Sequence, residues 1–161
     1  MKREIIVPFV TAAAEVLVTE TGVTLKRGKL SLQSFAVITD DVATLVGIVG
    51  GIQGMILLNL SLSTCLALLS RMLGYELTEF DELARSGIAE LGNVIAGRAA
   101  TKLSEAGRGA DITVPTIIVG RGTRISAPSF PRLVVPLETT CGTLELHLAV
   151  REVAANVSDG G

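Results

Sequence analysis

Apolar residues occupy nearly every position of two neighbouring segments, 42–50 and 52–60, which meet at Gly50-Gly51. Paired glycines between apolar runs of this length indicate a β-hairpin. The second segment is apolar at both odd and even positions, whereas a strand with one face in water alternates. We therefore predict that residues 52–60 form a central strand of a sheet.

An alternation of apolar and polar residues predicts further strands. They are expected over residues 23–32, 112–120, 132–139 and 143–152. Gly28 interrupts the first of them and favours a bulge there. The turn Thr140-Cys141-Gly142 would join the last two as a hairpin, in which Leu144 to Val150 presents one strict period-two face.

A period near 3.6 residues predicts three helices, over residues 8–19, 65–74 and from 79 to near Gly107. Gly22, Gly74 and Gly107 mark their ends, because glycine readily adopts the left-handed conformation of a helix C-terminus. Pro8 falls in the first turn of the first helix, where its missing N–H is tolerated. Ser63 or Thr64 would cap the second helix, and Thr78 the third.

The elements therefore follow the order helix, three strands, two helices, three strands. Helices clustered between runs of strands predict an α+β fold in which a largely antiparallel sheet packs against the long helix and the shorter ones. A chain of 161 residues suits one domain. We expect this domain over residues 1–155 and a flexible tail over residues 156–161.

The long predicted helix carries two different stripes. Its apolar stripe, which should pack on the sheet, recurs at spacings of three and four: Ala84, Ile88, Leu91, Ile95, Ala99 and Leu103. A second stripe lies roughly opposite: Ser86, Glu90, Asn93 and Gly97. Glu90 and Asn93 thus project together from one exposed ridge. Spacing alone also fits ordinary solvated helix residues, so it leaves both interpretations open.

Three glycines, Gly87, Gly92 and Gly97, fall within this helix. Glycine in a helix interior costs about 0.5–1 kcal/mol relative to alanine, so their presence requires a reason. We interpret them as residues that keep the helix surface low beside Glu90 and Asn93, so that another surface can approach closely. Packing within the protein is the alternative.

Charge and hydropathy exclude several function classes. The net charge is −2, the pI is near 5.4 and aromatic residues make up only 3% of the chain, so nucleic acid is not expected as a partner. No charged residue occurs from Val42 to Ser70, but polar residues and Gly50-Gly51 interrupt this run. We expect no membrane span, no signal peptide and a cytoplasmic protein.

The residues best suited to metal or nucleophilic chemistry are not grouped in the sequence. Cys65 and Cys141 are far apart, and we expect both to be reduced thiols rather than a disulfide or metal ligands. His147 lies on a predicted strand and is expected to be structural or merely exposed. We therefore expect no metal site on this chain.

The ridge residues resemble the signature of the CheC/CheX/FliY family of bacterial chemotaxis phosphatases. That signature has Asp or Ser, Glu four residues later, Asn three residues after that, and a proline some twenty residues downstream. Here it corresponds to Ser86, Glu90, Asn93 and Pro115, and the resemblance covers about residues 40–150. The chain carries one copy of the motif, as in the CheX branch, and the resemblance implies a CheC-like fold.

The resemblance also implies a function. The substrate would be a phosphorylated response regulator of the CheY type, and the chain would dephosphorylate its aspartyl phosphate. Asn93 would orient the hydrolytic water and Glu90 would pair with the receiver's lysine, while Ser86, Gly97 and Pro115 would contact the receiver. The receiver itself would supply Mg²⁺, so no cofactor is expected on this chain.

Two further expectations concern assembly and activity. CheX-like proteins are expected to form homodimers, and the segments 143–152 and 112–120 are the candidate edge strands for pairing. Pro115 removes one ladder donor, which confines the second segment to an edge or a bulge. The alternative function is a non-catalytic CheX-like module that binds a receiver domain or a scaffold.

Overall fold

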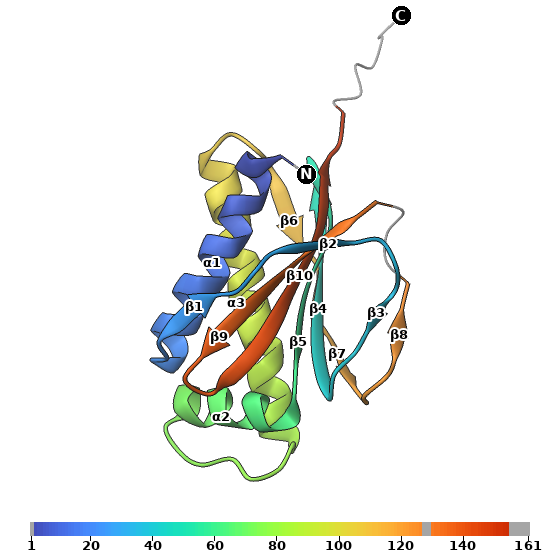
Figure 1. Cartoon of the computed structure of the whole chain (residues 1–161). Helices are drawn as coiled ribbons and strands as arrows, with labels where there is room; N and C mark the ends of the chain where they lie inside the picture. Colours follow the sequence, from blue (N-terminus) through green and yellow to red (C-terminus); the bar gives the residue numbers. More distant parts are fainter. Residues whose placement is uncertain (1, 127–129, 155–161) are drawn as a thin grey trace, which may run out of the picture.

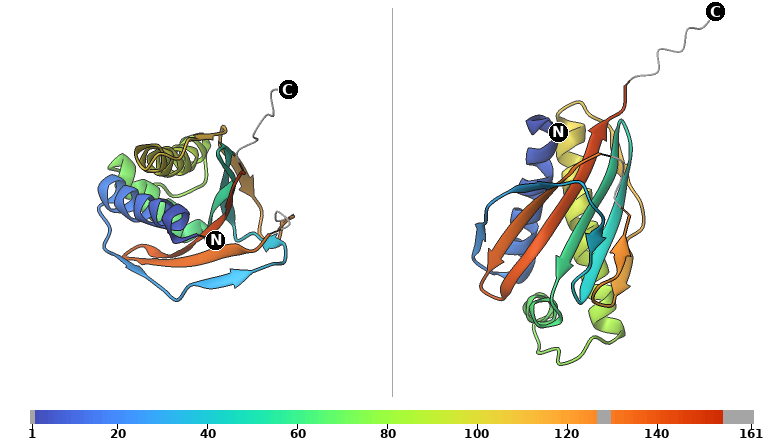
Figure 2. Two further views of the ribbon diagram at one scale, coloured as in Figure 1. Left: turned by 90° about the horizontal axis from the view of Figure 1, so that it is seen from above. Right: turned by 45° about the vertical axis from the view of Figure 1, so that its right-hand side comes forward.

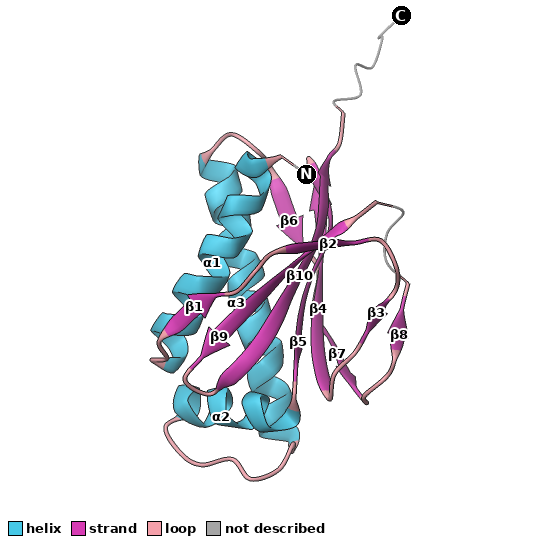
Figure 3. Cartoon of the chain, in the orientation of Figure 1, coloured by secondary structure: helices cyan, strands magenta, loops and turns pink. Residues whose placement is uncertain are grey.

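A large antiparallel sheet separates two helices from a small two-stranded ribbon in the computed structural model, which describes residues 2–126 and 130–154 (Figure 1, Figure 3). The helices are α1 (Arg3–Thr21), α2 (Leu62–Leu73) and α3 (Glu82–Glu105). Helices α1 and α3 lie on one face of the sheet, and α2 lies across one end of it. Figure 2 shows that the sheet curves around α1 and α3.

The strands are β1 (Leu25–Arg27), β2 (Ser31–Gln33), β3 (Val37–Ile38), β4 (Val42–Gly50), β5 (Ile52–Leu60), β6 (Ala110–Ile112), β7 (Thr116–Val119), β8 (Arg124–Ile125), β9 (Arg132–Thr139) and β10 (Gly142–Glu152). Within the described ranges, the sheet has the order β1-β9-β10-β5-β4-β6, with β2 also paired to β9 and β7 to β4. Strands β3 and β8 form the separate ribbon. The predicted α+β class and the central position of β5 are confirmed.

Several predicted boundaries agree with the structure. The β4–β5 hairpin is paired from Val42 opposite Leu60 to Ile48 opposite Gly54. Strand β9 has the predicted bounds, and a tight turn joins it to β10. Helices α1 and α2 end at Gly22 and Gly74, both in the left-handed conformation.

The predicted helix starts were wrong. Helix α1 begins at Arg3 and contains Pro8, because Ile5 and Phe9 are buried against the sheet and hold the helix together across the missing N–H. The caps also differ: the Ser61 hydroxyl accepts from the N–H of Thr64 at 3.2 Å. The Asp81 carboxylate accepts from the N–H of Ala84 at 2.9 Å. Several cap-forming residues precede each helix, and their spacing could not choose among them.

Two predicted strands are each divided in two. Residues 23–32 form β1 and β2, which separate after Arg27, where the N–H of Gly28 donates to the carbonyl of Pro136 at 2.8 Å. Residues 112–120 form parts of β6 and β7, which separate at residues 113–115. The ribbon strands β3 and β8 were not predicted, because each has only two residues and shows no period.

The core has two parts, one on each face of the sheet. The larger part lies between the sheet and the helices. The smaller part lies under the β3–β8 ribbon and is formed by Val37, Ala43, Met55, Leu57 and Ala149.

In the described residues, no helix has the length and apolar composition that crossing a bilayer requires. The predicted tail, residues 156–161, lies outside the described residues, and the single domain over 1–155 stays a prediction.

Strand β10 cannot be the edge that pairs with a second copy, because it lies between β9 and β5 and is hydrogen-bonded to both. The expectation for residues 143–152 was therefore wrong. Leu144, Leu146, Leu148 and Val150 face the helices, and His147 and Ala149 are buried on the opposite face of the sheet. The remaining candidate, residues 112–120, does lie at an edge, as β6 and β7 beside β4.

Candidate functional site

The apolar stripe of helix α3 determines which face of the helix packs against the sheet. All six stripe residues are buried between the helix and the sheet: Ala84, Ile88, Leu91, Ile95, Ala99 and Leu103. The second stripe consequently faces away from the core. Ser86 and Glu90 are exposed, and Asn93 and Gly97 are half-buried.

A hollow of about 500 Å³ lies beside this second stripe. One wall comes from α3 and the other from the segment between β6 and β7. The lining residues are Ser86, Ala89, Glu90, Asn93, Ile112, Thr113, Val114 and Pro115. The structure thus brings together four of the predicted site residues, including Pro115, which is distant in sequence. Gly97 does not line the hollow.

The second wall is a β-bulge in the edge segment formed by β6 and β7, opposite strand β4. Ile112 pairs with Ile48 and Thr116 with Leu45, so residues 113–115 lie opposite only two residues of β4. The N–H of Thr113 donates to the carbonyl of Gly47 at 2.9 Å, and its hydroxyl accepts from the N–H of Gly47 at 2.8 Å. Pro115, which cannot donate, falls inside the bulge, as its chemistry predicts.

Of this wall, only Pro115 was predicted from the sequence. Gly47 could have indicated that another segment approaches β4 closely, because it interrupts a strand of branched residues. A methyl group placed on Gly47 would lie 2.9 Å from both γ atoms of Thr113. The glycine therefore lets the bulge approach β4 closely.

Glu90 and Asn93 lack the ion-pair partner that the cations Arg98 and Lys102 of the same helix have. Arg98 and Lys102 both contact Glu15 of α1, at 3.3 and 3.2 Å, and lower the pKa of its carboxyl, mainly through the Lys102 hydrogen bond. Among the described residues, neither the Glu90 carboxylate nor the Asn93 amide has a hydrogen bond or an ion pair. Both side chains are available to a molecule that enters the hollow.

The glycines of α3 have different roles from one another. A methyl group on Gly87 would lie 3.0 Å from Leu69 of α2, and one on Gly92 would lie 3.0 Å from Thr44 of β4. Both glycines are buried, so they serve packing, and the expectation that they shape the outer surface was wrong. Gly97 alone has room, since a methyl group there would meet only Ile112, at 3.9 Å.

A larger hollow of about 1000 Å³ lies between the start of α1 and the end of β10. Its charged groups are already engaged: Lys2 contacts Glu152 at 2.7 Å, and Arg151 lies over the Phe130 ring, 5.4 Å from its centroid. Its other lining residues are mostly apolar. Unpaired polar groups therefore favour the smaller hollow as the reactive site.

His147 is buried in a polar network on the sheet. Arg132, which is 1% exposed, donates from Nε to His147 Nδ1 at 3.0 Å. Because arginine can only donate, His147 carries its proton on Nε2, which donates to Glu145 at 3.2 Å. His147 is thus structural.

The residues suited to metal binding are not grouped in the fold. In residues 2–126 and 130–154 no three His, Cys, Asp or Glu side chains lie together as a set that could hold a metal. Cys65 and Cys141 are both free thiols.

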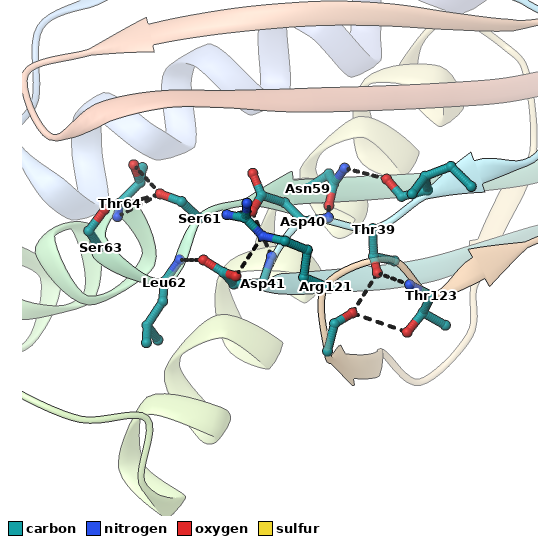
Figure 4. Close-up of polar contacts among 12 residues, drawn as sticks. Thr39, Asp40, Asp41, Asn59, Ser61, Leu62, Ser63, Thr64, Arg121 and Thr123 are labelled. Carbon is teal, nitrogen blue, oxygen red and sulfur yellow. Dashed lines mark hydrogen bonds and ion pairs between the residues drawn. The ribbon is translucent and has the colours of Figure 1, made fainter.

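A second polar cluster ties the end of β7 to α2 (Figure 4). The Asp41 carboxylate accepts from the N–H of Leu62 at 2.8 Å and from Arg121 Nε at 3.1 Å. These two contacts, the first being the larger, hold the pKa of Asp41 below its usual range. The Thr39 hydroxyl donates to the Gly120 carbonyl at 2.7 Å. The cluster anchors the edge strand that forms the bulge.

The family description "Chemotaxis phosphatase CheX" matches residues 42–138, which include α3 and the whole hollow. The CheY-P phosphatase CheX of Thermotoga maritima is 38% identical over 128 residues, which are 79% of this chain and 83% of that protein. The chain belongs to the CheX family of chemotaxis phosphatases. The predicted family and the predicted phosphatase activity are confirmed.

Solved structures support the same family. A CheC-like superfamily protein from a Shewanella species has a TM-score of 0.85 at 26% identity, covering 94% of this chain and 99% of that chain. Chemotaxis protein CheX from Desulfovibrio desulfuricans has a TM-score of 0.83 at 29% identity, with coverages of 92% and 99%. The CheX-CheY-BeF3-Mg²⁺ complex from Borrelia burgdorferi has a TM-score of 0.78 at 32% identity, with coverages of 91% and 97%. The predicted CheC-like fold is confirmed.

Proposed function

We propose that this CheX-family chain hydrolyses the aspartyl phosphate of a CheY-like receiver at the hollow between α3 and the β6–β7 bulge. Two similarities support this substrate. The Thermotoga relative is named as a CheY-P phosphatase, and the Borrelia structure holds CheX with CheY, BeF3 and Mg²⁺. BeF3 stands in for the phosphoryl group, and the Mg²⁺ of that complex supports a metal that arrives with the receiver.

We assign to Asn93 the positioning of the hydrolytic water. Hydrolysis requires a water in line with the bond to the leaving carboxylate, and positioning this water supplies the rate gain. A side-chain amide can accept a hydrogen bond from the water through its oxygen and donate another to a phosphoryl oxygen through its nitrogen. The water-positioning glutamine of small GTPases acts in a comparable way. No proton-transfer group of this chain is required in this scheme.

Glu90 is the residue we assign to orienting the receiver. Its carboxylate lies one helical turn before Asn93 and lines the same hollow. Arg98 and Lys102 contact Glu15, and Arg85 lies over the Phe80 ring, so none of these three cations of α3 pairs with Glu90. An ion pair with the receiver's lysine would fix the position of the receiver over Asn93. Ser86 and Pro115 would contact the receiver at the rim, and Gly97 would leave room for it one turn further along.

The observation that carries the proposal is the pair of unpartnered polar side chains in one hollow. We expect Asn93→Ala to reduce receiver dephosphorylation by about 100-fold or more, as removal of one transition-state contact does in other enzymes. Binding of a BeF3-loaded receiver should be largely retained. Phosphate release with a phosphorylated receiver measures the first effect, and calorimetric titration the second.

Arg98→Ala is the matched control, because Arg98 lies on the same helix outside the hollow. It should keep wild-type turnover. Wild-type turnover by Asn93→Ala would contradict the assignment of the water. Receiver binding without any turnover by the unmodified protein would instead support the alternative, a non-catalytic module.

We also propose a homodimer that pairs through the β7 edge. The outer edge of β7 has no strand partner within the described residues, and Val119 on it is exposed. Sedimentation equilibrium at micromolar concentration tests this, since a mass near 16.8 kDa at every concentration would exclude the dimer.

A further inference from the structure

Val114 stands out among the apolar residues of the surface. It is 85% exposed, more than any other large apolar side chain of the described residues. Exposed valines are common, but this one lines the same hollow as Glu90 and Asn93. Its side chain forms the apolar rim of the site opposite α3.

The backbone on both sides of Val114 is held firmly. Thr113 is bonded to Gly47 through both its N–H and its hydroxyl. Pro115 has a fixed φ angle and confines the preceding residue to extended conformations. The branched side chain of valine has few rotamers. Burying Val114 in a complex would therefore cost little conformational entropy.

We infer that Val114 is a docking residue that becomes buried against an apolar patch of the receiver beside its phosphorylated aspartate. The inference rests on the proposed function. A receiver that places its phosphoryl group at Asn93 must cover the rim of a hollow of about 500 Å³, and Val114 is part of that rim. Val114 has no polar side-chain atom, so it contributes to receiver binding and selectivity rather than to the chemical step.

The substitutions Val114→Asp and Val114→Thr test this, because the first adds a charge and the second changes only the polarity. Desolvating a valine in an interface corresponds to about tenfold or more in affinity. Val114→Asp should raise KM for the phosphorylated receiver by about tenfold or more, and Val114→Thr by about threefold. The kcat should stay within about twofold of wild type, since Asn93 still holds the water. Affinity for the BeF3-loaded receiver should fall in parallel.

Val18→Asp is the matched control, an exposed valine on α1 that lies outside both the hollow and the β7 edge. It should leave KM unchanged, and circular dichroism melts should show all three variants folded. An unchanged KM in Val114→Asp overturns the inference even when Asn93→Ala is inactive, so the proposed function can stand without it. If Val114→Asp lowers the sedimentation mass but not receiver affinity, Val114 belongs to a contact between copies and the inference fails.

Discussion

Two polar regions of this protein are opposites in their hydrogen bonding. On β9 and β10, Arg132, His147 and Glu145 form a continuous hydrogen-bonded chain, and Arg132 is buried. On α3, Glu90 and Asn93 have no partner among the described residues and face a hollow. The first region contains the residue types most often associated with catalysis, and the second contains a plain carboxylate and amide.

The difference shows that availability, rather than residue type, marks the candidate site. Arg132 donates to His147, to Gln33 at 2.9 Å and to the carbonyl of Phe35, so its donors hold the chain before β3 against the sheet. A buried polar group that is fully bonded adds to structure and is costly to remove. Substitutions in the network should therefore affect stability, and substitutions in the hollow should affect activity.

The largest effect expected from this contrast is that of Arg132→Met. The change leaves His147, Gln33 and a backbone carbonyl without their donor, and we expect the free energy of unfolding to fall by about 3–5 kcal/mol. Urea denaturation measures it. Arg121→Met is the control, because that side chain is 70% exposed and its pairs with Asp40 and Asp41 should contribute little. Equal losses in both variants would contradict a structural role for the network.

The second prediction concerns the hollow. Glu90→Lys would place a cation against the receiver's lysine and Mg²⁺, so both receiver binding and turnover should fall by about 100-fold or more. The melting temperature should stay close to wild type, because the Glu90 side chain is exposed. Titration with a BeF3-loaded receiver tests binding, and unchanged affinity would exclude Glu90 as the orienting contact.

EDTA should stop turnover by removing Mg²⁺ from the receiver, and added Mg²⁺ should restore it.

Sequence patterns predicted the parts of this contrast that repeat at regular spacing. The apolar stripe of α3 and the hairpin at Gly50-Gly51 follow directly from periodicity. The bulge does not, because it depends on how residues 112 and 116 pair with β4, far away in sequence. The packing role of Gly92 could not be predicted from the sequence for the same reason, because its neighbour Thr44 lies on β4.

The third prediction separates two glycines of α3. Gly97→Ala has room for its methyl group, so it should raise the free energy of unfolding by about 0.5–1 kcal/mol through helix propensity. Gly92→Ala would bring its methyl group to 3.0 Å from both γ atoms of Thr44, so no rotation of Thr44 relieves the contact. Overpacking of this kind costs about 1–3 kcal/mol, and we expect a net destabilisation of about 1 kcal/mol.

Thermal melts of the two variants should therefore move in opposite directions, by about 2–4 °C for each kcal/mol. If a receiver approaches α3 closely at Gly97, Gly97→Ala should also raise KM while it raises stability. A more stable variant with an unchanged KM would remove Gly97 from the contact surface.

The smallest effect expected is a pH dependence that arises from the network. The pKa of Glu145 lies below its ordinary value of 4.5, chiefly because the His147 N–H donates to its carboxylate, and Asn59 and Arg132 act in the same direction. The folded protein therefore binds this proton less readily than the unfolded chain. The stability contributed by Glu145 is present above about pH 4.5 and is lost as the pH falls through the folded pKa. Glu145→Gln should lower the melting temperature slightly at pH 6 and flatten its decline between pH 5 and pH 3, because the amide can still accept from His147 but does not titrate. A decline as steep as that of wild type would show that Glu145 is not coupled to the fold, and that the network ends at His147.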